Sequence, residues 1–281
     1  RNLRVVGITG TDGKTTTCTL VHGIVSSAGV RAGLVTTVGA RTASGTVATG
    51  LHTTTPEAEE LQAMLAEMAD AGLSTAVLEV TSHGLDQERV ADIAFDVAAV
   101  TNITREALEY HGTMEAYRAA KRRLFELAAA SPAKPALPKT AVLNASDASF
   151  EALAAVPMAR RITYSAGGAA DFSVLQVHRT RGGLAFSAIT PVGEMALRSP
   201  LSGRHNVANI LAALAVAHAL DIPPAAWPEG VAATSGIPGR MEAIDEGQTI
   251  AAIVDFAHTP NALRHALRTA RELVEPGGRL I

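Results

Sequence analysis

A glycine-rich stretch near the start of the chain has the composition of a phosphate-binding loop. It reads VGITGTDGKTTT over residues 6–17. An apolar run leads into a turn with two glycines, and Gly-Lys-Thr then opens a predicted helix. Glycines let backbone N–H groups curl around phosphate oxygens, and the helix N-terminus adds partial positive charge. Lys14 is therefore expected to reach the β- and γ-phosphates, and the Thr15 hydroxyl to bind Mg²⁺.

This loop departs from the common phosphate-loop pattern. That pattern has glycine where this chain has Ile8, and the glycines stand at 7 and 10 instead. A tight strand-to-helix turn without a ligand is the alternative interpretation. Gly-Lys-Thr placed directly after a strand favours the phosphate loop.

A buried-strand pattern ends in a carboxylate at Glu79. Strand 75–80 is expected to present Glu79 on the same side of the sheet as the phosphate loop, where a carboxylate can hold Mg²⁺ against nucleotide phosphates. The alternative is a solvated glutamate at a strand end. His83 follows in the same loop, and its residue type alone assigns it no role.

Lys121 lies on the apolar stripe of a predicted helix. The stripe is formed by Met114, Tyr117, Leu124, Phe125 and Ala128. One interpretation is a lysine whose stem crosses a partly buried face while its amine reaches water. Burial would instead lower the lysine pKa and give a neutral amine, which reacts with CO₂ to form a carbamate, a negatively charged metal ligand.

The elements that must position these residues alternate between strands and helices. Strands are predicted at 4–9, 33–37, 75–80, 97–103 and 140–144, and helices at about 14–28, 57–70 and 113–130. This alternation predicts an α/β fold with a mostly parallel sheet wrapped by helices.

The pattern changes after residue 161. Segments 172–178 and 184–189 alternate around an Arg-Gly-Gly turn and predict an antiparallel hairpin, and a second short pair is predicted at 188–190 and 195–197. Helices are predicted at 206–219 and 223–233, and again at 260–274 after a strand at 250–256. Gly-Ile-Pro-Gly at 236–239 marks a boundary, so we predict domains at 1–236 and 237–281. A strand signal at Arg279 would leave a sheet edge exposed, and we expect a further segment to complete the second domain.

Composition narrows the class of protein. The chain has 281 residues, of which 47% are apolar and 18% charged, and its net charge is −3. This balance gives no electrostatic footprint for nucleic acid or anionic lipid. The single Cys18 excludes an internal disulfide and fits a reducing compartment. The sequence shows neither a membrane-spanning run nor a signal peptide, so a cytoplasmic enzyme is expected.

Seven stretches together resemble the Mur ligase family. The loop is similar to the family form Gly-Thr-Asn-Gly-Lys-Thr. The other stretches are TTTPE at 53–57, LEVTSHGLDQERV at 78–90, TNITREALEYHGTMEAYRAAKRRLF at 101–125, GRHNVANILAAL at 203–214, GRME at 239–242 and VDFAHTPNAL at 254–263. The resemblance implies a P-loop ATPase domain with a small antiparallel β portion, followed by the first βα unit of a Rossmann-like C-terminal domain.

Within the family, the chain is most similar to ligases that add the third amino acid to UDP-N-acetylmuramoyl-dipeptide in peptidoglycan synthesis. The resemblance implies ATP and Mg²⁺ as cofactors, a UDP-muramoyl peptide and an amino acid as substrates, an acyl-phosphate intermediate, and a monomer without nucleic-acid or membrane partners. It also implies that the UDP-binding domain and most of the amino-acid-selecting domain are missing. A folylpolyglutamate-synthetase-like ligase and a non-catalytic nucleotide-binding module are the alternatives.

The resemblance assigns roles to individual residues. Nucleotide binding falls on Gly10, Thr11, Asp12, Gly13, Lys14, Thr15, Thr16, Asn209, Arg240 and Asp255. Metal binding falls on Thr15, Glu79 and Lys121, the last as a carbamate, and catalysis on Lys14 and Lys121. Substrate binding falls on Thr54, Thr55, Thr81, Gln87 and Arg89. By residue type alone, turn capping by the threonines at 54 and 55 and helix capping by Asn206 remain open.

Two positions depart from the family. Ala107 stands where the family has a histidine that helps to bind the second metal, and His111 or Glu106 could replace that ligand. Asp12 stands where asparagine is usual. A second carboxylate beside phosphates is unfavourable unless it points away, although aspartate tolerates the left-handed turn conformation as asparagine does.

Overall fold

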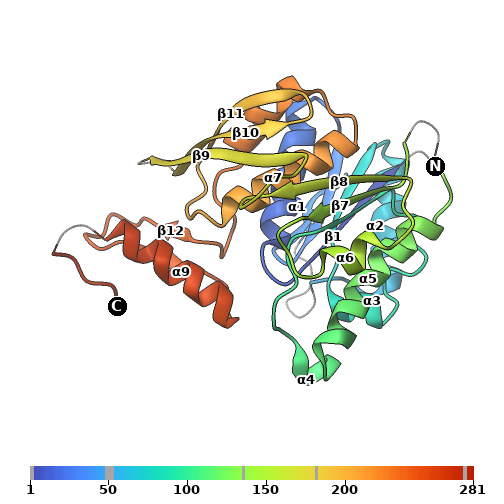
Figure 1. The fold of residues 1–281 in the computed structure, drawn as a ribbon, viewed down its shortest axis with the longest axis horizontal. Helices are drawn as coiled ribbons and strands as arrows, with labels where there is room; N and C mark the ends of the chain where they lie inside the picture. The colour runs from blue at the N-terminus through green and yellow to red at the C-terminus, as the bar shows by residue number, and fades with distance from the viewer. Residues whose placement is uncertain (1–2, 48–53, 135–136, 181–182, 275–276) are drawn as a thin grey trace.

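An eleven-stranded sheet forms the body of the protein. The computed structural model describes residues 3–47, 54–134, 137–180, 183–274 and 277–281. Six neighbouring strands are parallel (Figure 1), in the order β2 (Ala32–Thr36), β5 (Thr75–Glu79), β1 (Arg4–Thr9), β6 (Val97–Val100), β7 (Thr140–Asn144) and β8 (Arg160–Ser165). Five of them are buried along most of their length, as expected for strands covered by helices on each side, whereas β8 begins with the half-buried Arg160 and the exposed Arg161.

Helices cover the two faces of this sheet (Figure 1). One face carries α1 (Lys14–Ser27), α7 (Asn206–Ala219), the 3-10 turn η1 (Pro224–Ala226) and α8 (Trp227–Ala233). The other carries α2 (Ala58–Asp70), α3 (Ser82–Asp86), α5 (Met114–Ala130) and α6 (Phe150–Ala154), with α4 (Leu108–His111) before α5. Helix α7 is apolar all round and almost wholly buried, because it lies between the sheet, α1 and the strands beyond β8.

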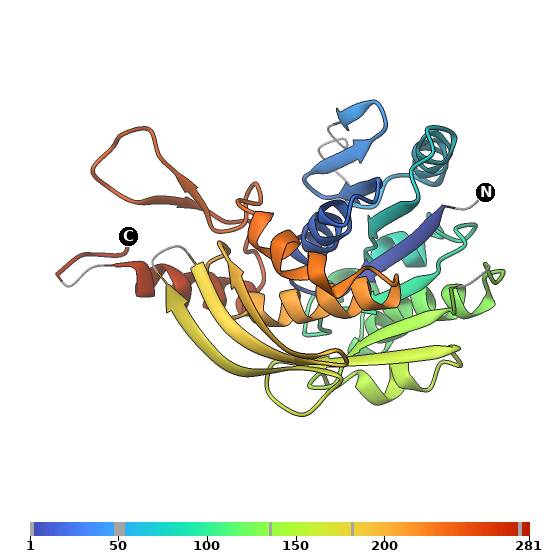
Figure 2. The ribbon, with the colours of Figure 1, turned by 90° about the horizontal axis from the view of Figure 1, so that it is seen from above.

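Antiparallel strands extend the sheet at both edges. Strand β9 (Phe172–Thr180) pairs parallel with β8 and antiparallel with β10 (Gly183–Thr190), which pairs with β11 (Gly193–Ser199). The predicted hairpins are confirmed, and these strands curve away from the parallel part of the sheet (Figure 2). Arg181 and Gly182 of the predicted turn lie outside the described residues. Strand β8 and the edge pair β3 (Gly39–Thr42) and β4 (Gly45–Val47) were not predicted from the sequence.

One observed strand is shorter than predicted, and the residues that follow it contact the phosphate loop. The strand predicted at 97–103 ends at Val100. Beyond Val100 the Thr101 N–H still donates to the Thr9 carbonyl at 3.0 Å, while the side chains of Thr101 and Asn102 donate to the Asp12 carbonyl, at 2.7 and 3.0 Å. The end of β6 therefore supports the phosphate loop instead of extending the sheet.

The C-terminal segment is small and lightly packed. It contains a two-stranded antiparallel sheet, β12 (Glu242–Ile244) with β13 (Ala252–Val254), and helix α9 (Pro260–Leu273). The strand predicted at 250–256 is shorter than expected, and the strand predicted from Arg279 is wrong. Residues 278–281 have no regular structure, because no described strand pairs with them. The predicted domain boundary at 236 stays a prediction. Among the described helices, none is long and apolar enough to cross a bilayer.

Candidate functional site

The glycine-rich loop between β1 and α1 is closed to larger side chains. Gly13 caps α1 with φ 84°, and Gly10 has φ 147°, both in the region that favours glycine. A Cβ at Gly13 would collide with the Asn209 amide, and a Cβ at Gly10 with the Thr101 hydroxyl. Glycine is therefore required at both positions by conformation and by close approach.

Backbone and side-chain hydrogen bonds fix the loop before any ligand arrives. The Thr11 N–H donates to the Asn102 carbonyl at 2.7 Å, and the Asp12 N–H to the Asn102 side-chain oxygen at 3.1 Å. The Lys14 amine donates to the carbonyls of Gly10 and Thr11, at 3.0 and 2.7 Å. Lys14 thus lies against its own loop, and a phosphate group would compete with two carbonyls for its amine.

Glu79 is the last residue of β5, the strand predicted at 75–80, and β5 lies beside β1 in the sheet. The parallel register pairs it with Ile8, and the side chain is 2% exposed. Its Oε2 accepts from the Thr15 hydroxyl at 2.9 Å and from the Thr37 N–H at 3.0 Å, and its Oε1 accepts from the Thr37 hydroxyl at 3.1 Å. The Glu79 carboxylate and the hydroxyls of Thr15 and Thr37 offer hard oxygen ligands, the type that Mg²⁺ prefers. The residues therefore fit the metal ion that the sequence implies.

Lys121 is buried, as its place on the apolar stripe predicts. It is 1% exposed, and its amine donates to the Gly10 carbonyl at 2.7 Å. The amine lies 4.5 Å from the centre of the Tyr117 ring. Desolvation, reinforced by the nearby charge of Lys14, holds the pKa of Lys121 well below its usual range. The structure thus favours the buried-amine interpretation over a stem that reaches water.

A cavity of about 260 Å³ collects the charged groups. Its lining includes Lys14, Thr15, Glu79 and Lys121, the residues for which phosphate or metal roles are predicted. Arg240 also lines it and donates to the Thr15 hydroxyl at 3.1 Å. A group bound here would meet two amines, a guanidinium and the carboxylates of Glu79 and Glu106 within one partly enclosed space.

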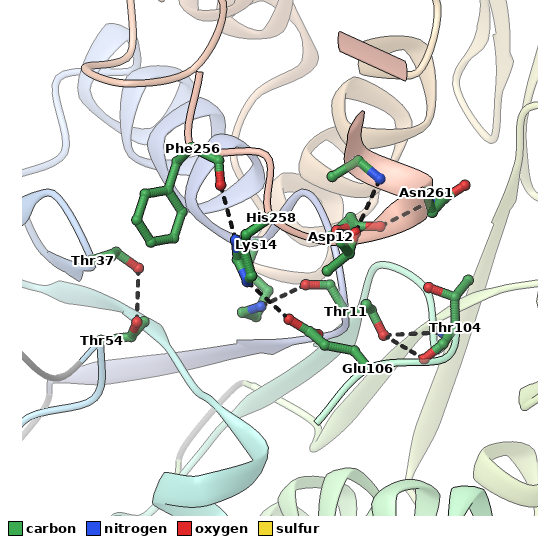
Figure 3. Close-up of polar contacts among 12 residues, drawn as sticks. Thr11, Asp12, Lys14, Thr37, Thr54, Thr104, Glu106, Phe256, His258 and Asn261 are labelled. Atoms are coloured by element: carbon green, nitrogen blue, oxygen red, sulfur yellow. Dashed lines mark hydrogen bonds and ion pairs between the residues drawn. The ribbon is translucent and has the colours of Figure 1, made fainter. Parts of the chain in front are cut away.

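Of the two substitutes for the missing histidine, Glu106 lies on this cavity. Glu106 Oε2 accepts from the Tyr117 hydroxyl at 3.0 Å. Its Oε1 lies 3.3 Å from His258 Nε2 (Figure 3). Ala107 also lines the cavity and has a left-handed φ of 53°. His111 instead packs its ring against Tyr110 and Tyr117. The geometry therefore supports Glu106, and not His111, as the metal ligand that replaces the histidine missing at Ala107.

A second cavity, of about 330 Å³, adjoins the other side of the loop. Gly13, Thr16, Asn209, Arg240 and Asp255 are among its lining residues. The Asn209 amide donates to the Asn206 side-chain oxygen at 2.9 Å, and the Asn206 amide donates to the Ser202 carbonyl at 2.7 Å.

The structure decides one alternative for this region and fixes the position of Asp255. The N-cap of α7 is His205, so the capping interpretation of Asn206 is wrong. Asp255 accepts from the N–H groups of Met241 and Ala257, at 2.7 and 2.8 Å, which fixes its carboxylate at the cavity wall.

The five residues predicted to bind substrate fall into two groups. Thr54 and Thr81 line the charged cavity. Thr55 is buried behind it, where its hydroxyl donates to the Glu79 carbonyl at 3.2 Å. Arg89 donates to the Thr55 carbonyl at 2.9 Å, and the Gln87 amide lies 3.4 Å from the Tyr110 hydroxyl.

The capping alternative has partial support among these residues. Thr81 caps α3 by accepting from the Gly84 N–H at 3.0 Å, so its hydroxyl has a structural task as well as a place on the cavity. Thr53, the first residue of the TTTPE stretch, lies outside the described residues.

Several site residues were missed by the sequence analysis. Thr37 joins Glu79 to Thr54, with 3.0 Å between the Thr37 and Thr54 hydroxyls (Figure 3). Tyr117 joins Thr11 to Glu106, with 3.0 Å between the Thr11 and Tyr117 hydroxyls. A signal existed for both: Thr37 ends a predicted strand, and Tyr117 lies one helical turn before Lys121 on the same stripe.

The chain was compared with known proteins. The family model for the Mur ligase middle domain matches residues 8–217, and the model for the Mur ligase glutamate ligase domain matches residues 239–281. The chain is 42% identical over 282 residues to UDP-N-acetylmuramoyl-L-alanyl-D-glutamate--2,6-diaminopimelate ligase of Bacillus licheniformis, covering 98% of this chain and 56% of that protein.

Two further matches agree with this one. UDP-N-acetylmuramyl-tripeptide synthetase of a Roseiflexus species is 43% identical over 98% of this chain and 55% of its own length. A solved structure of UDP-N-acetylmuramoyl-L-alanyl-D-glutamate--2,6-diaminopimelate ligase superposes with a TM-score of 0.79 at 34% identity, covering 98% of this chain and 55% of that one. The chain thus spans about half the length of these relatives.

Proposed function

Since the chain belongs to the Mur ligase family, we propose that it carries the ATP-binding part of a ligase that adds the third amino acid to UDP-N-acetylmuramoyl-dipeptide. The observation that carries the proposal is the charged cavity, where Lys14, Thr15, Glu79 and Lys121 face one another beside the phosphate loop. The names of the most similar relatives supply the substrate class.

The proposed reaction has two steps. A carboxylate oxygen of the muramoyl peptide attacks the γ-phosphorus of ATP, the bond from that phosphorus to the β–γ bridging oxygen breaks, and ADP leaves. The amine of the incoming amino acid then attacks the acyl carbon, phosphate leaves, and the amine gives up a proton. Both steps place negative charge on phosphoryl oxygens, so positioning and charge stabilisation carry the catalysis.

Each residue of the cavity has a place in this scheme. The Lys14 amine would leave the loop carbonyls and donate to phosphoryl oxygens. Thr15 and Glu79 would hold Mg²⁺, which neutralises phosphate charge when bound. Lys121, as a carbamate, would supply a further anionic ligand with Glu106 close by. Thr54 and Thr81 would contact the muramoyl peptide at the open side of the cavity.

The second cavity is assigned to the nucleoside. The Asn209 amide can meet the adenine edge, and the Asp255 carboxylate can accept from ribose hydroxyls. Arg240 lines both cavities and would follow the phosphate chain from one to the other. We also propose a cytoplasmic location, because ATP is supplied there and the single Cys18 is a free thiol.

Calorimetric titration with ATP and Mg²⁺ tests the nucleotide site. Lys14→Ala is expected to weaken binding by roughly 30-fold, about 2 kcal/mol, because it removes a charge-assisted donor to phosphate. Arg122→Ala is the matched control: Arg122 is an exposed cation paired with Glu126 on the outer face of α5. Unchanged affinity in Lys14→Ala would show that the loop does not bind phosphate.

A non-catalytic nucleotide-binding role is the second candidate, because Ala107 removes a side chain that could hold a metal ion. ATP turnover by a chain of the relatives' full length separates the two. A ligase releases phosphate only when the muramoyl peptide is present, whereas a binding module retains ATP unchanged.

A further inference from the structure

The Asp12 carboxylate turns away from the phosphate site and towards the C-terminal helix. Its Oδ2 accepts from the Asn261 side-chain amide at 2.9 Å, and its Oδ1 accepts from the Thr259 hydroxyl at 3.3 Å (Figure 3). The carboxylate that looked unfavourable beside phosphates is thus directed to two donors on a different element.

The backbone of Asp12 is held just as firmly, but by the sheet. Its N–H donates to the Asn102 side-chain oxygen at 3.1 Å, and its carbonyl accepts from the Thr101 hydroxyl at 2.7 Å. One residue of the phosphate loop is therefore bound through its backbone to the end of β6 and through its side chain to α9.

The partner of Asp12 is the start of α9. Thr259 is the N-cap of that helix and accepts from the Ala262 N–H at 3.0 Å. A carboxylate at a helix N-terminus is favoured by the helix dipole. The rest of α9 buries little, with Thr269 as its buried residue among those described. The contact with Asp12 is thus a large part of what fixes this end of α9.

The position of α9 shapes the proposed nucleoside cavity. Ala262 and His265 of α9 line it together with Asp12 and Gly13 of the loop. A shift of α9 relative to the loop would open one wall of the cavity and leave Lys14, Thr15 and Glu79 in place, because none of these belongs to α9.

We propose that Asp12 and Asn261 are positioning residues that latch α9 onto the phosphate loop and thereby set the width of the nucleoside cavity. The inference rests on the proposed function for the identity of the ligand, but the latch itself does not require a nucleotide. It also accounts for aspartate in this loop, because the side chain serves α9 and leaves the phosphate site to backbone N–H groups.

The pairing is directional, which makes it testable by exchange. One side chain must accept and the other must donate. Asn261→Asp would set two carboxylates against each other, whereas the double variant Asp12→Asn/Asn261→Asp restores one acceptor and one donor in the reverse order. Rescue by exchange is expected for a direct contact and not for two residues that matter separately.

Two measurements are made on the full 281-residue chain. The first is ATP affinity with Mg²⁺ by calorimetry. The second is the rate of trypsin cleavage after Arg264 and Arg268, two exposed residues of α9, without nucleotide. Asn261→Asp is expected to weaken ATP binding about tenfold and to raise the cleavage rate by a similar factor. The double variant should return both values to within about threefold of the parent.

Leu263→Asp is the matched control. It adds the same charge in the same turn of α9 at a side chain that is 45% exposed, so both values should stay at those of the parent. The latch is wrong if Asn261→Asp behaves like the parent, or if Asp12→Asn fails to rescue it. If the parent chain binds no ATP, the proposed function fails, while the trypsin rates still decide the latch.

Discussion

Burial changes what Lys121 can do chemically. On an exposed surface a lysine amine is protonated at neutral pH and is not a nucleophile. Here the amine is shielded, lies beside the Tyr117 ring and faces the charge of Lys14, and all three features of its surroundings are set by its position on α5. A lowered pKa increases the fraction of neutral amine, which is the form that adds to CO₂.

We predict that Lys121 forms a carbamate in the presence of bicarbonate. The amine nitrogen attacks the carbon of CO₂ and loses a proton, so the charge at the site changes from about +1 to −1, which a nearby cation favours. Carbon-13 NMR with labelled bicarbonate should show a carbamate signal that grows on addition of Mg²⁺. The signal should fade as the pH falls through the lowered pKa of Lys121, because the amine is then protonated.

Two variants test this prediction, one that should abolish the carbamate signal and one that should make it form at a lower Mg²⁺ concentration. Lys121→Arg keeps a cation but cannot form the carbamate, so the signal should vanish while the other lysines remain. Ala107→His adds a neutral metal ligand at the cavity wall and should lower the Mg²⁺ concentration needed for half of the signal. A signal that persists in Lys121→Arg would assign the carbamate to another amine.

The residues that the sequence predicted best are those in one contiguous motif. Lys14 and Thr15 follow the glycines directly, so their placement depends on local geometry alone. Thr37 and Tyr117 were missed because their roles arise from contacts with other elements, Thr37 with Glu79 of β5 and Tyr117 with Glu106 of the loop before α4. Single residue types such as threonine and tyrosine carry too little information to reveal such contacts.

At the scale of elements, periodicity predicted the parallel strands and the long helices well. The bounds predicted for β1 and β7 are confirmed residue for residue. Strand β8 was missed because its RRITYS sequence is charged at one end and lacks the apolar run of its neighbours. Its pairing with β7 is what orders it, and such pairing cannot be read from a local pattern.

The contact of His205, the N-cap of α7, with His265 of α9 predicts an acid-sensitive fold. His205, at the start of α7, lies 5.4 Å from the His265 ring of α9. Burial, with a smaller contribution from His265, lowers the pKa of His205 to about 4, although Asp255 and Asp12 act in the opposite direction. Because the unfolded state binds the proton more readily, stability is complete above about pH 6.5 and falls as the pH drops towards 4.

Urea denaturation followed by Trp227 fluorescence measures this loss. The decrease between pH 7 and pH 4.5 attributable to His205 should be on the order of 2–3 kcal/mol. His205→Gln should flatten the profile, because glutamine does not titrate. His178→Gln, at an exposed position of β9, should leave the profile unchanged. An equally steep profile in His205→Gln would assign the acid sensitivity to other groups.

At the scale of the whole molecule, the two parts of the chain that line the site differ greatly in how many side chains they bury. Residues up to about 237 share large cores on both faces of the sheet, whereas the segment with β12, β13 and α9 contributes few buried side chains. The sequence, through Gly-Ile-Pro-Gly at 236–239, predicts a domain boundary close to this change in packing, and that boundary stays a prediction. The sequence could not predict how α9 lies on the loop, because that depends on the long-range contacts of Asp12.

This division predicts that nucleotide links the motions of the two parts. Helix α7 is almost wholly buried, while α9 buries Thr269 and exposes Leu267, so α9 should open locally at low free-energy cost. Without nucleotide, its backbone amides should therefore exchange with deuterium far faster than those of α7.

ATP in the nucleoside cavity contacts walls from both parts and must leave before α9 detaches. At a free ATP concentration 100 times Kd, exchange in α9 should slow by about 100-fold, while α7 hardly changes. Lys14→Ala should lose this protection at the same ATP concentration. Exchange in α9 as slow as in α7 without nucleotide, or unaffected by saturating ATP, would contradict the coupling.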